Sequence, residues 1–116
     1  MSLRYPNLEG TADEKGRLQW HYGVDKNVKK LYGGSLTENI VQAVARCVMT
    51  DGMLRIQDRY RCVLTVHDEV VVVVPEEEAK EAEAWVREQM IADPHYLTGI
   101  PLDAESSSAI RYGEAK

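Results

Sequence analysis

A histidine and two carboxylates, His67, Asp68 and Glu69, lie between two strongly apolar runs. Residues 62–66 read Cys-Val-Leu-Thr-Val, and residues 70–74 are consecutive valines. Charged side chains within such runs are costly to bury unless they reach water, a partner or a metal ion. A tight turn would carry them out of the apolar strands, and carboxylate oxygens held there suit Mg²⁺. On spacing alone, the pattern favours ordinary polar turn residues over a metal site.

The two apolar runs predict an antiparallel hairpin whose turn lies at or next to His67-Asp68. β-branched residues favour strands, and an unbroken valine run is typical of a strand that is buried on both faces. Pro75 should end the second strand. The acidic residues 76–78 then fit the first turn of a helix, where negative charge meets the positive end of the helix dipole, and Pro94 closes that helix.

A longer helix is expected ahead of the hairpin. Ser35 and Glu38 have the spacing of a capping box, with Ser35 as the N-cap. Apolar residues then recur at helical spacing, so we expect the helix to continue to about Asp58. This helix would lead the chain directly into the hairpin.

The remaining segments complete a small α+β fold. Residues 1–16 show no periodicity and are expected to be an irregular lead-in. Residues 17–22 and 28–32 suggest a further hairpin, and residues 100–105 suggest a final strand. The sequence therefore predicts one domain over residues 17–116, in which a small antiparallel sheet, the central hairpin plus the C-terminal strand, packs with two main helices.

Composition limits the function classes. The chain has 116 residues, 44% of them apolar, which is enough for one modest core. Its net charge of −5 argues against a dedicated nucleic-acid-binding module, although that argument weakens for a part of a larger enzyme. No apolar run approaches the roughly 20 residues that span a bilayer, and no signal peptide is recognisable. We expect a cytoplasmic protein without membrane contact, in which Cys47 and Cys62 are reduced.

Several short motifs follow one another in order from about Trp20 onward. Val-His-Asp-Glu lies between two β-branched runs at residues 66–69, and Tyr-Gly-Gly at residues 32–34 precedes Glu-Asn-Ile-Val-Gln-Ala-Val-Ala-Arg at residues 38–46. Gly-Ile-Pro-Leu begins at Gly99, and the chain closes with Arg-Tyr-Gly before its last residues. This ordered set resembles the C-terminal palm region of phage-type family A DNA polymerases, the family of bacterial DNA polymerase I. The first motif is similar to motif C of that family.

The resemblance implies roles for five residues. Asp68 is expected to be a ligand of the catalytic Mg²⁺ ions, and Glu69 to support that site as its acidic neighbour. His67 is expected near the primer end. Gln42 would face the minor groove of the primer-template, and Asn39 would serve similarly. The fold implied is a partial polymerase palm, and the partners of the complete enzyme would be primer-template DNA and deoxynucleoside triphosphates.

Parts of the family pattern are missing from this sequence. The family requires a second aspartate, in motif A, and a fingers helix that grips the triphosphate, and neither is found here. Cys47 stands where the phage-type pattern has an aspartate. Asp103 and Glu105 share one face of the expected final strand, but exposed or edge positions account for them better than a catalytic role. We therefore expect weak Mg²⁺ binding and no DNA-directed DNA polymerase activity, which is nucleotidyl transfer, from the isolated chain.

Two other functions remain open on the sequence. The chain could be a non-catalytic structural or interaction module that descends from a prophage polymerase. It could also be a small metal-dependent nuclease built around Asp68 and Glu69, which would need further carboxylates nearby. A fragment of a palm should expose apolar surface, so we expect a homodimer.

Overall fold

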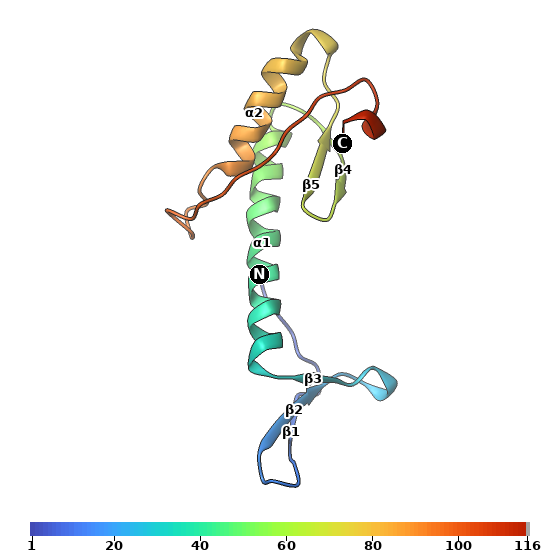
Figure 1. Ribbon diagram of the computed structural model, residues 1–116, viewed down its shortest axis with the longest axis vertical. Helices are drawn as coiled ribbons and strands as arrows, with labels where there is room; N and C mark the ends of the chain where they lie inside the picture. The colour runs from blue at the N-terminus through green and yellow to red at the C-terminus, as the bar shows by residue number, and fades with distance from the viewer. Residues whose placement is uncertain (116) are drawn as a thin grey trace. The chain divides into compact units, whose positions relative to one another are not determined.

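The computed structural model describes residues 1–115 and has an α+β fold with two small antiparallel sheets and two α-helices (Figure 1). The chain divides into two compact units, one of residues 1–45 and the other from residue 46 onward. Helix α1 (Gly33–Gln57) contributes to both units, so the domain predicted over residues 17–116 includes parts of each. Within the described part of the chain, no helix is both long and apolar enough to cross a membrane.

The first unit contains a three-stranded antiparallel sheet in the order β1-β2-β3. Its strands are β1 (Glu9–Ala12), β2 (Leu18–Tyr22) and β3 (Lys29–Leu31). The hairpin expected from β2 and β3 is confirmed. The irregular lead-in expected over residues 1–16 is wrong at β1, which is fully exposed and shows no apolar alternation. This strand forms because it pairs with β2, so its own side chains do not show in the sequence that a strand is present.

Helix α1 begins three residues earlier than the capping box predicts, because an N-cap at Ser35 would make Leu36 the first helical residue. Its first residue is Gly33, and Ser35 lies inside the first turn. The Tyr32 N–H donates to Ser35 Oγ at 3.0 Å, and this hydroxyl donates to the Tyr32 carbonyl at 2.9 Å. Ser35 therefore caps the helix from within, with Tyr32 ahead of the first turn. The end of α1 at Gln57 agrees with the predicted end near Asp58.

The second unit contains the predicted central hairpin. Strands β4 (Cys62–Val66) and β5 (Glu69–Val72) are antiparallel, with an irregularity in register between Cys62 and Leu64. The expectation of a valine strand buried on both faces is wrong, because β5 is half-buried and Val73 after it is 68% exposed. Among the described residues no further strand pairs with the hairpin, so it remains a two-stranded sheet.

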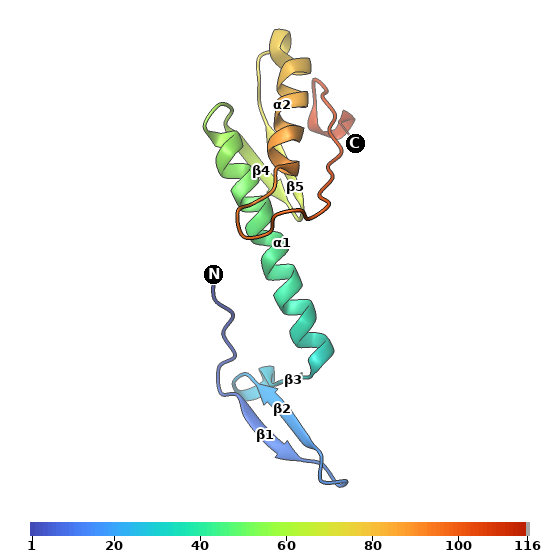
Figure 2. The same cartoon turned by 90° about the vertical axis from the view of Figure 1, so that its left-hand side faces the viewer.

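A small core in the second unit positions the hairpin. Ile56 of α1, Tyr60 and Ala82 of α2 (Ala79–Ile91) are buried together, and Val70 and Val72 of β5 pack against them. The C-terminal part of α1, α2 and the hairpin lie side by side (Figures 1 and 2). Gly52 permits a close approach of the two helices, because an added Cβ there would lie 2.9 Å from Met90 Sδ. The core therefore fixes the base of the hairpin against both helices and leaves its turn outside.

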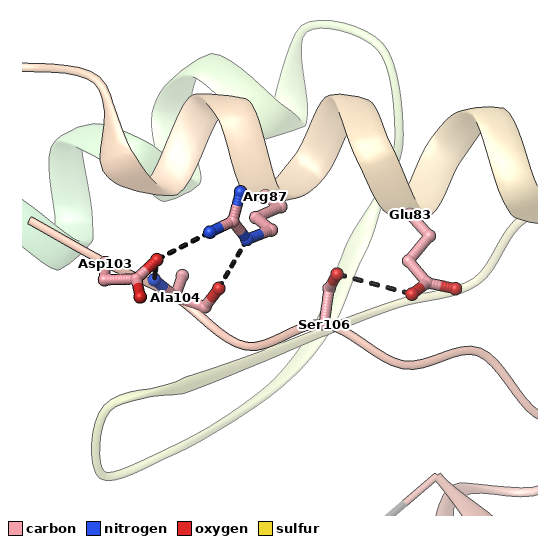
Figure 3. A network of polar contacts seen from close by, with 5 residues as sticks. All are labelled: Glu83, Arg87, Asp103, Ala104 and Ser106. Carbon is pink, nitrogen blue, oxygen red and sulfur yellow. Dashed lines mark hydrogen bonds and ion pairs between the residues drawn. The ribbon is translucent and has the colours of Figure 1, made fainter.

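The final strand expected over residues 100–105 is absent from the described structure. Side chains of α2 hold this segment instead (Figure 3). Arg87 donates from Nε to the Ala104 carbonyl and from Nη2 to Asp103 Oδ1, both at 2.6 Å. Ser106 Oγ donates to Glu83 Oε1 at 3.3 Å. The segment is thus held along a helix rather than along a strand edge, and no sheet ladder forms.

Candidate functional site

The tip of the β4–β5 hairpin is a two-residue turn formed by His67 and Asp68. Val66 and Glu69 are the last paired residues of the two strands. His67 has a φ of +53°, in the left-handed region that few non-glycine residues adopt but that His, Asn and Asp occupy more often than others. Both turn residues are exposed, whereas Glu69 is half-buried. The turn therefore presents an imidazole and a carboxylate to solvent, as predicted.

The carboxylates at the tip do not form a complete metal site within this chain. No group of three or more His, Cys, Asp or Glu residues able to hold a metal ion occurs in residues 1–115. Mg²⁺ prefers an octahedral oxygen shell and retains its waters when protein ligands are few. Asp68 and Glu69 by themselves would offer such an ion only two carboxylates.

The base of the hairpin is held by polar and aromatic contacts. The Cys62 N–H donates to Gln57 Oε1 at 2.9 Å, which links the end of α1 to the start of β4. Burial raises the pKa of the Cys62 thiol, so it stays protonated at neutral pH. The Tyr60 ring contacts Trp85 edge-on at a centroid distance of 5.7 Å. Trp85 also packs against the buried core of this unit.

Arg59 lies over both aromatic rings at the base of the hairpin. Its guanidinium carbon is 5.1 Å from the ring centre of Tyr60 and 5.3 Å from that of Trp85. Its Nη2 also donates to Glu81 Oε1 at 2.8 Å, and this hydrogen bond is the main reason that the pKa of Arg59 is raised. The cation joins the loop before β4 to α2, so the hairpin rises from a fixed base.

The two residues expected to contact the primer-template lie in the first unit, whereas the hairpin belongs to the second. Asn39 and Gln42 are three positions apart on α1 and so share a helix face. Asn39 is half-buried and donates from Nδ2 to Tyr5 Oη at 3.3 Å. Gln42 is exposed, and its Nε2 donates to Glu38 Oε1 at 3.2 Å. Gln42 therefore remains accessible to a partner, and Asn39 is held by its own unit.

One feature of the first unit was not recognised as a site from the sequence. A hollow with a volume of about 470 Å³ lies at the end of the β2–β3 pairing, and aromatic and cationic side chains line it. Trp20 and Lys30 are among them. The signal for this hollow was present in the alternating apolar residues of β2 and in the paired lysines of β3, but each alone is weak.

Comparison with known proteins gives one informative similarity. No protein-family model matches the chain, and no solved structure matches it. The chain is 39% identical over 77 residues to a DNA polymerase of Bacillus phage SP02. The match covers 64% of this chain and 11% of the phage polymerase, so the chain corresponds to a small part of that relative. This protein is therefore similar to a segment of a phage DNA polymerase.

Proposed function

We propose that this chain supplies the C-terminal part of the palm of a phage-type family A DNA polymerase, with Asp68 as a ligand of the catalytic magnesium ions. The observation that carries the proposal is the position of Asp68. It lies at the exposed tip of a valine-rich hairpin, in a chain 39% identical over 77 residues to a phage DNA polymerase. A strand-turn-strand unit of this kind holds a carboxylate on a rigid support while keeping it in water.

The activity of the complete enzyme would be nucleotidyl transfer. The primer 3′-hydroxyl would lose its proton to solvent, and its oxygen would form a bond to the α-phosphorus of a deoxynucleoside triphosphate. The bond between that phosphorus and the oxygen that bridges to the β-phosphate would break, and pyrophosphate would leave. Catalysis of this kind depends on positioning and on stabilisation of charge, which magnesium supplies when it is bound. Asp68 and Glu69 are a partial ligand set, so the missing carboxylate and the triphosphate-binding groups would come from elsewhere in the polymerase.

The other assigned residues have binding roles in this proposal. His67 lies next to Asp68 in the turn and would contact the primer end, which its exposure permits. Gln42 would face the minor groove of the primer-template. Its amide would give up its hydrogen bond to Glu38 and bind the edge of a base instead. Asn39 would need to release Tyr5 to do the same. The enzyme would act in the cytoplasm.

Exposed apolar side chains on the hairpin support a role within a larger protein. Val63, Leu64 and Val73 are all more exposed than is usual for aliphatic residues of a folded domain. Exposed apolar side chains become a binding surface where they lie together. We assign this surface to contacts with the rest of the polymerase. The homodimer of the isolated chain would use the same surface.

A chimera tests the proposal directly. The matching segment of the phage SP02 polymerase is replaced by this chain, and primer extension is measured with magnesium. We expect the chimera to extend primers and Asp68→Asn to lower the rate by roughly a hundredfold or more, because the substitution removes a ligand of the charge-stabilising ions. Asp58→Asn is the matched control, since Asp58 is also exposed in the second unit and lies outside the hairpin. Full activity of the Asp68→Asn chimera would sink the metal-ligand role.

The isolated chain gives the complementary result. We expect no primer extension from the purified 116-residue protein, because it lacks the residues that complete the ligand set. Extension by the isolated chain would contradict the proposal. A folded but inactive chimera would instead favour a non-catalytic module.

A further inference from the structure

The hollow in the first unit opens where β3 separates from β2. Trp20 and Leu31 form the last cross-strand pair, and after it the chain turns into α1. Leu18 and Gln19 therefore have no β3 partner on that side, although β2 continues past them. The gap is lined on one side by residues 17–20 and on the other by residues 30–33. It is an open depression of about 470 Å³.

Trp20 and Tyr32 are among the residues that line this hollow, and a glycine lies close to each ring. Trp20 is 44% exposed and Tyr32 is 62% exposed. A Cβ added at Gly10 would lie 3.2 Å from the six-membered ring of Trp20, and one added at Gly34 would lie 2.8 Å from the ring of Tyr32. The rings thus pack against bare backbone, which orients them while leaving much of their surface in water. Exposed, oriented rings are suitable platforms for base stacking.

Cations accompany the two rings. Arg17 and Lys30 line the hollow, and no ion pair of Lys30 is present in the part of the chain that the structure describes. Asp13 also lines it, but its Oδ1 accepts the backbone N–H groups of Lys15 and Arg17 at 2.9 and 2.8 Å. Its Oδ2 lies 3.7 Å from Arg17 Nε, an exposed pair in which Arg17 remains largely in solvent. The carboxylate is therefore engaged locally.

The first unit, which contains the hollow, is more basic than the rest of the chain. Residues 1–45 contain six Lys and Arg against five Asp and Glu, whereas residues 46–116 contain eight against fourteen. The first unit is thus slightly basic within an acidic protein. Aromatic rings combined with solvent-exposed cations match the base and phosphate groups of a nucleic acid, whereas an apolar peptide would offer the cations no anionic partner.

We infer that the hollow formed by Arg17, Trp20, Lys30 and Tyr32 binds single-stranded DNA, with bases stacked on the aromatic rings and phosphates held by the cations. The inference rests on the proposed function for the presence of DNA, but it assigns a separate surface from the hairpin tip and from Gln42.

Binding is tested with the full chain and a fluorescently labelled oligothymidylate of about twelve nucleotides, within the range of site sizes known for single-strand binding proteins. Anisotropy gives the affinity. We expect Trp20→Ala to weaken binding roughly tenfold and Trp20→Phe to retain most of the affinity, because a stacked base needs a ring. An abasic oligonucleotide of the same length should bind the parent protein as weakly as the oligothymidylate binds Trp20→Ala. Equal binding of the abasic and thymidylate strands would overturn the stacking assignment.

Salt dependence tests the cations. We expect Lys30→Ala to reduce the slope of log affinity against log salt by about 0.7, the value for one phosphate contact on a single strand. Lys26→Ala is the matched control, since Lys26 is exposed in the same unit and does not line the hollow. Equal slopes for both variants would exclude Lys30 from the surface. Circular dichroism confirms that each variant retains the secondary structure of the parent.

The two proposals fail separately. If the chimera is inactive but Trp20→Ala still weakens DNA binding by the isolated chain, only the polymerase proposal is lost. If the chimera is active and Trp20→Ala and Lys30→Ala bind DNA like the parent, only the hollow is refuted. An absence of any DNA binding by the parent at low salt also refutes the hollow.

Discussion

The hydroxyl of Tyr96 donates a hydrogen bond of 2.6 Å to Oδ2 of Asp51, which joins the segment after α2 to helix α1. The two residues are 45 positions apart in the sequence. This hydrogen bond, followed by desolvation and the charge of Asp51, raises the pKa of Tyr96 from its usual value of 10 to about 12. The neutral phenol is therefore favoured in the folded protein.

This pKa shift predicts a loss of stability at alkaline pH. The folded pKa is raised, so the contribution of Tyr96 is complete below pH 10 and is lost as the pH rises towards about 12. Urea unfolding should show that Tyr96→Phe is less stable than the parent below pH 10, and that the difference shrinks as the pH approaches 12. A difference that stays constant over this range would show that the hydrogen bond does not control the titration.

The contact between Gly52 and Met90 predicts strong dependence on side-chain size. We expect Gly52→Val to lower the free energy of unfolding by about 1–3 kcal/mol, because its Cβ would lie 2.9 Å from Met90 Sδ and would force the helices apart. Gly33→Ala, where an added Cβ meets nothing within 4 Å, should be neutral or slightly stabilising. Chemical denaturation of both variants checks the pair, and equal losses would contradict the close approach of the helices.

The core of the second unit depends on Ile56. Its side chain is fully buried, so Ile56→Ala should cost about 2–5 kcal/mol of folding free energy through lost burial and the cavity left behind. Leu54→Ala on the same helix serves as control. Leu54 is 62% exposed, and we expect a change within about 0.5 kcal/mol. Thermal and urea unfolding of the two variants measure the contrast, and a mild effect at Ile56 would mean that the hairpin packs elsewhere.

Substitution of Arg87 should loosen one segment of the chain rather than lower the stability of the whole fold. Its ion pair with Asp103 is exposed and should contribute little by itself, so Asp103→Asn is expected to change the free energy of unfolding by less than about 1 kcal/mol. Arg87→Ala also removes the bond to the Ala104 carbonyl, and it should speed hydrogen exchange across residues 103–108. Lys80→Ala is the control on the same helix. Unchanged exchange in Arg87→Ala would show that Glu83 and the serines suffice to hold the segment.

The hairpin could be predicted because its signal is local. β-branched residues on both sides of His67-Asp68 and a polar pair between them leave few alternatives to a strand, a turn and a strand. The position of Asp68 follows from the same pattern. The exposure of Val73 did not follow, because burial of a strand depends on which other elements pack against it, and a run of valines does not specify them.

Longer-range features escaped the sequence for physical reasons. Residues 100–105 alternate as a strand would, but the partner they meet is Arg87 on a helix rather than a strand edge. Strand β1 has no apolar side to reveal it and exists through its pairing with β2. The predicted start of α1 lies too late, because Gly33 and Gly34 suggest a loop before the helix. The first turn of a helix nevertheless tolerates both glycines.

The valine-rich hairpin has a consequence for the protein in solution. It forms a two-stranded sheet whose outer edges have no strand partner among the described residues, and the run from Val70 to Val74 contains no charge or proline. Such edges are templates on which further strands of the same sequence can assemble into cross-β fibrils. Concentrated samples of the isolated chain should therefore develop thioflavin fluorescence over time, and a charge introduced at the solvent-facing Val73 should delay it.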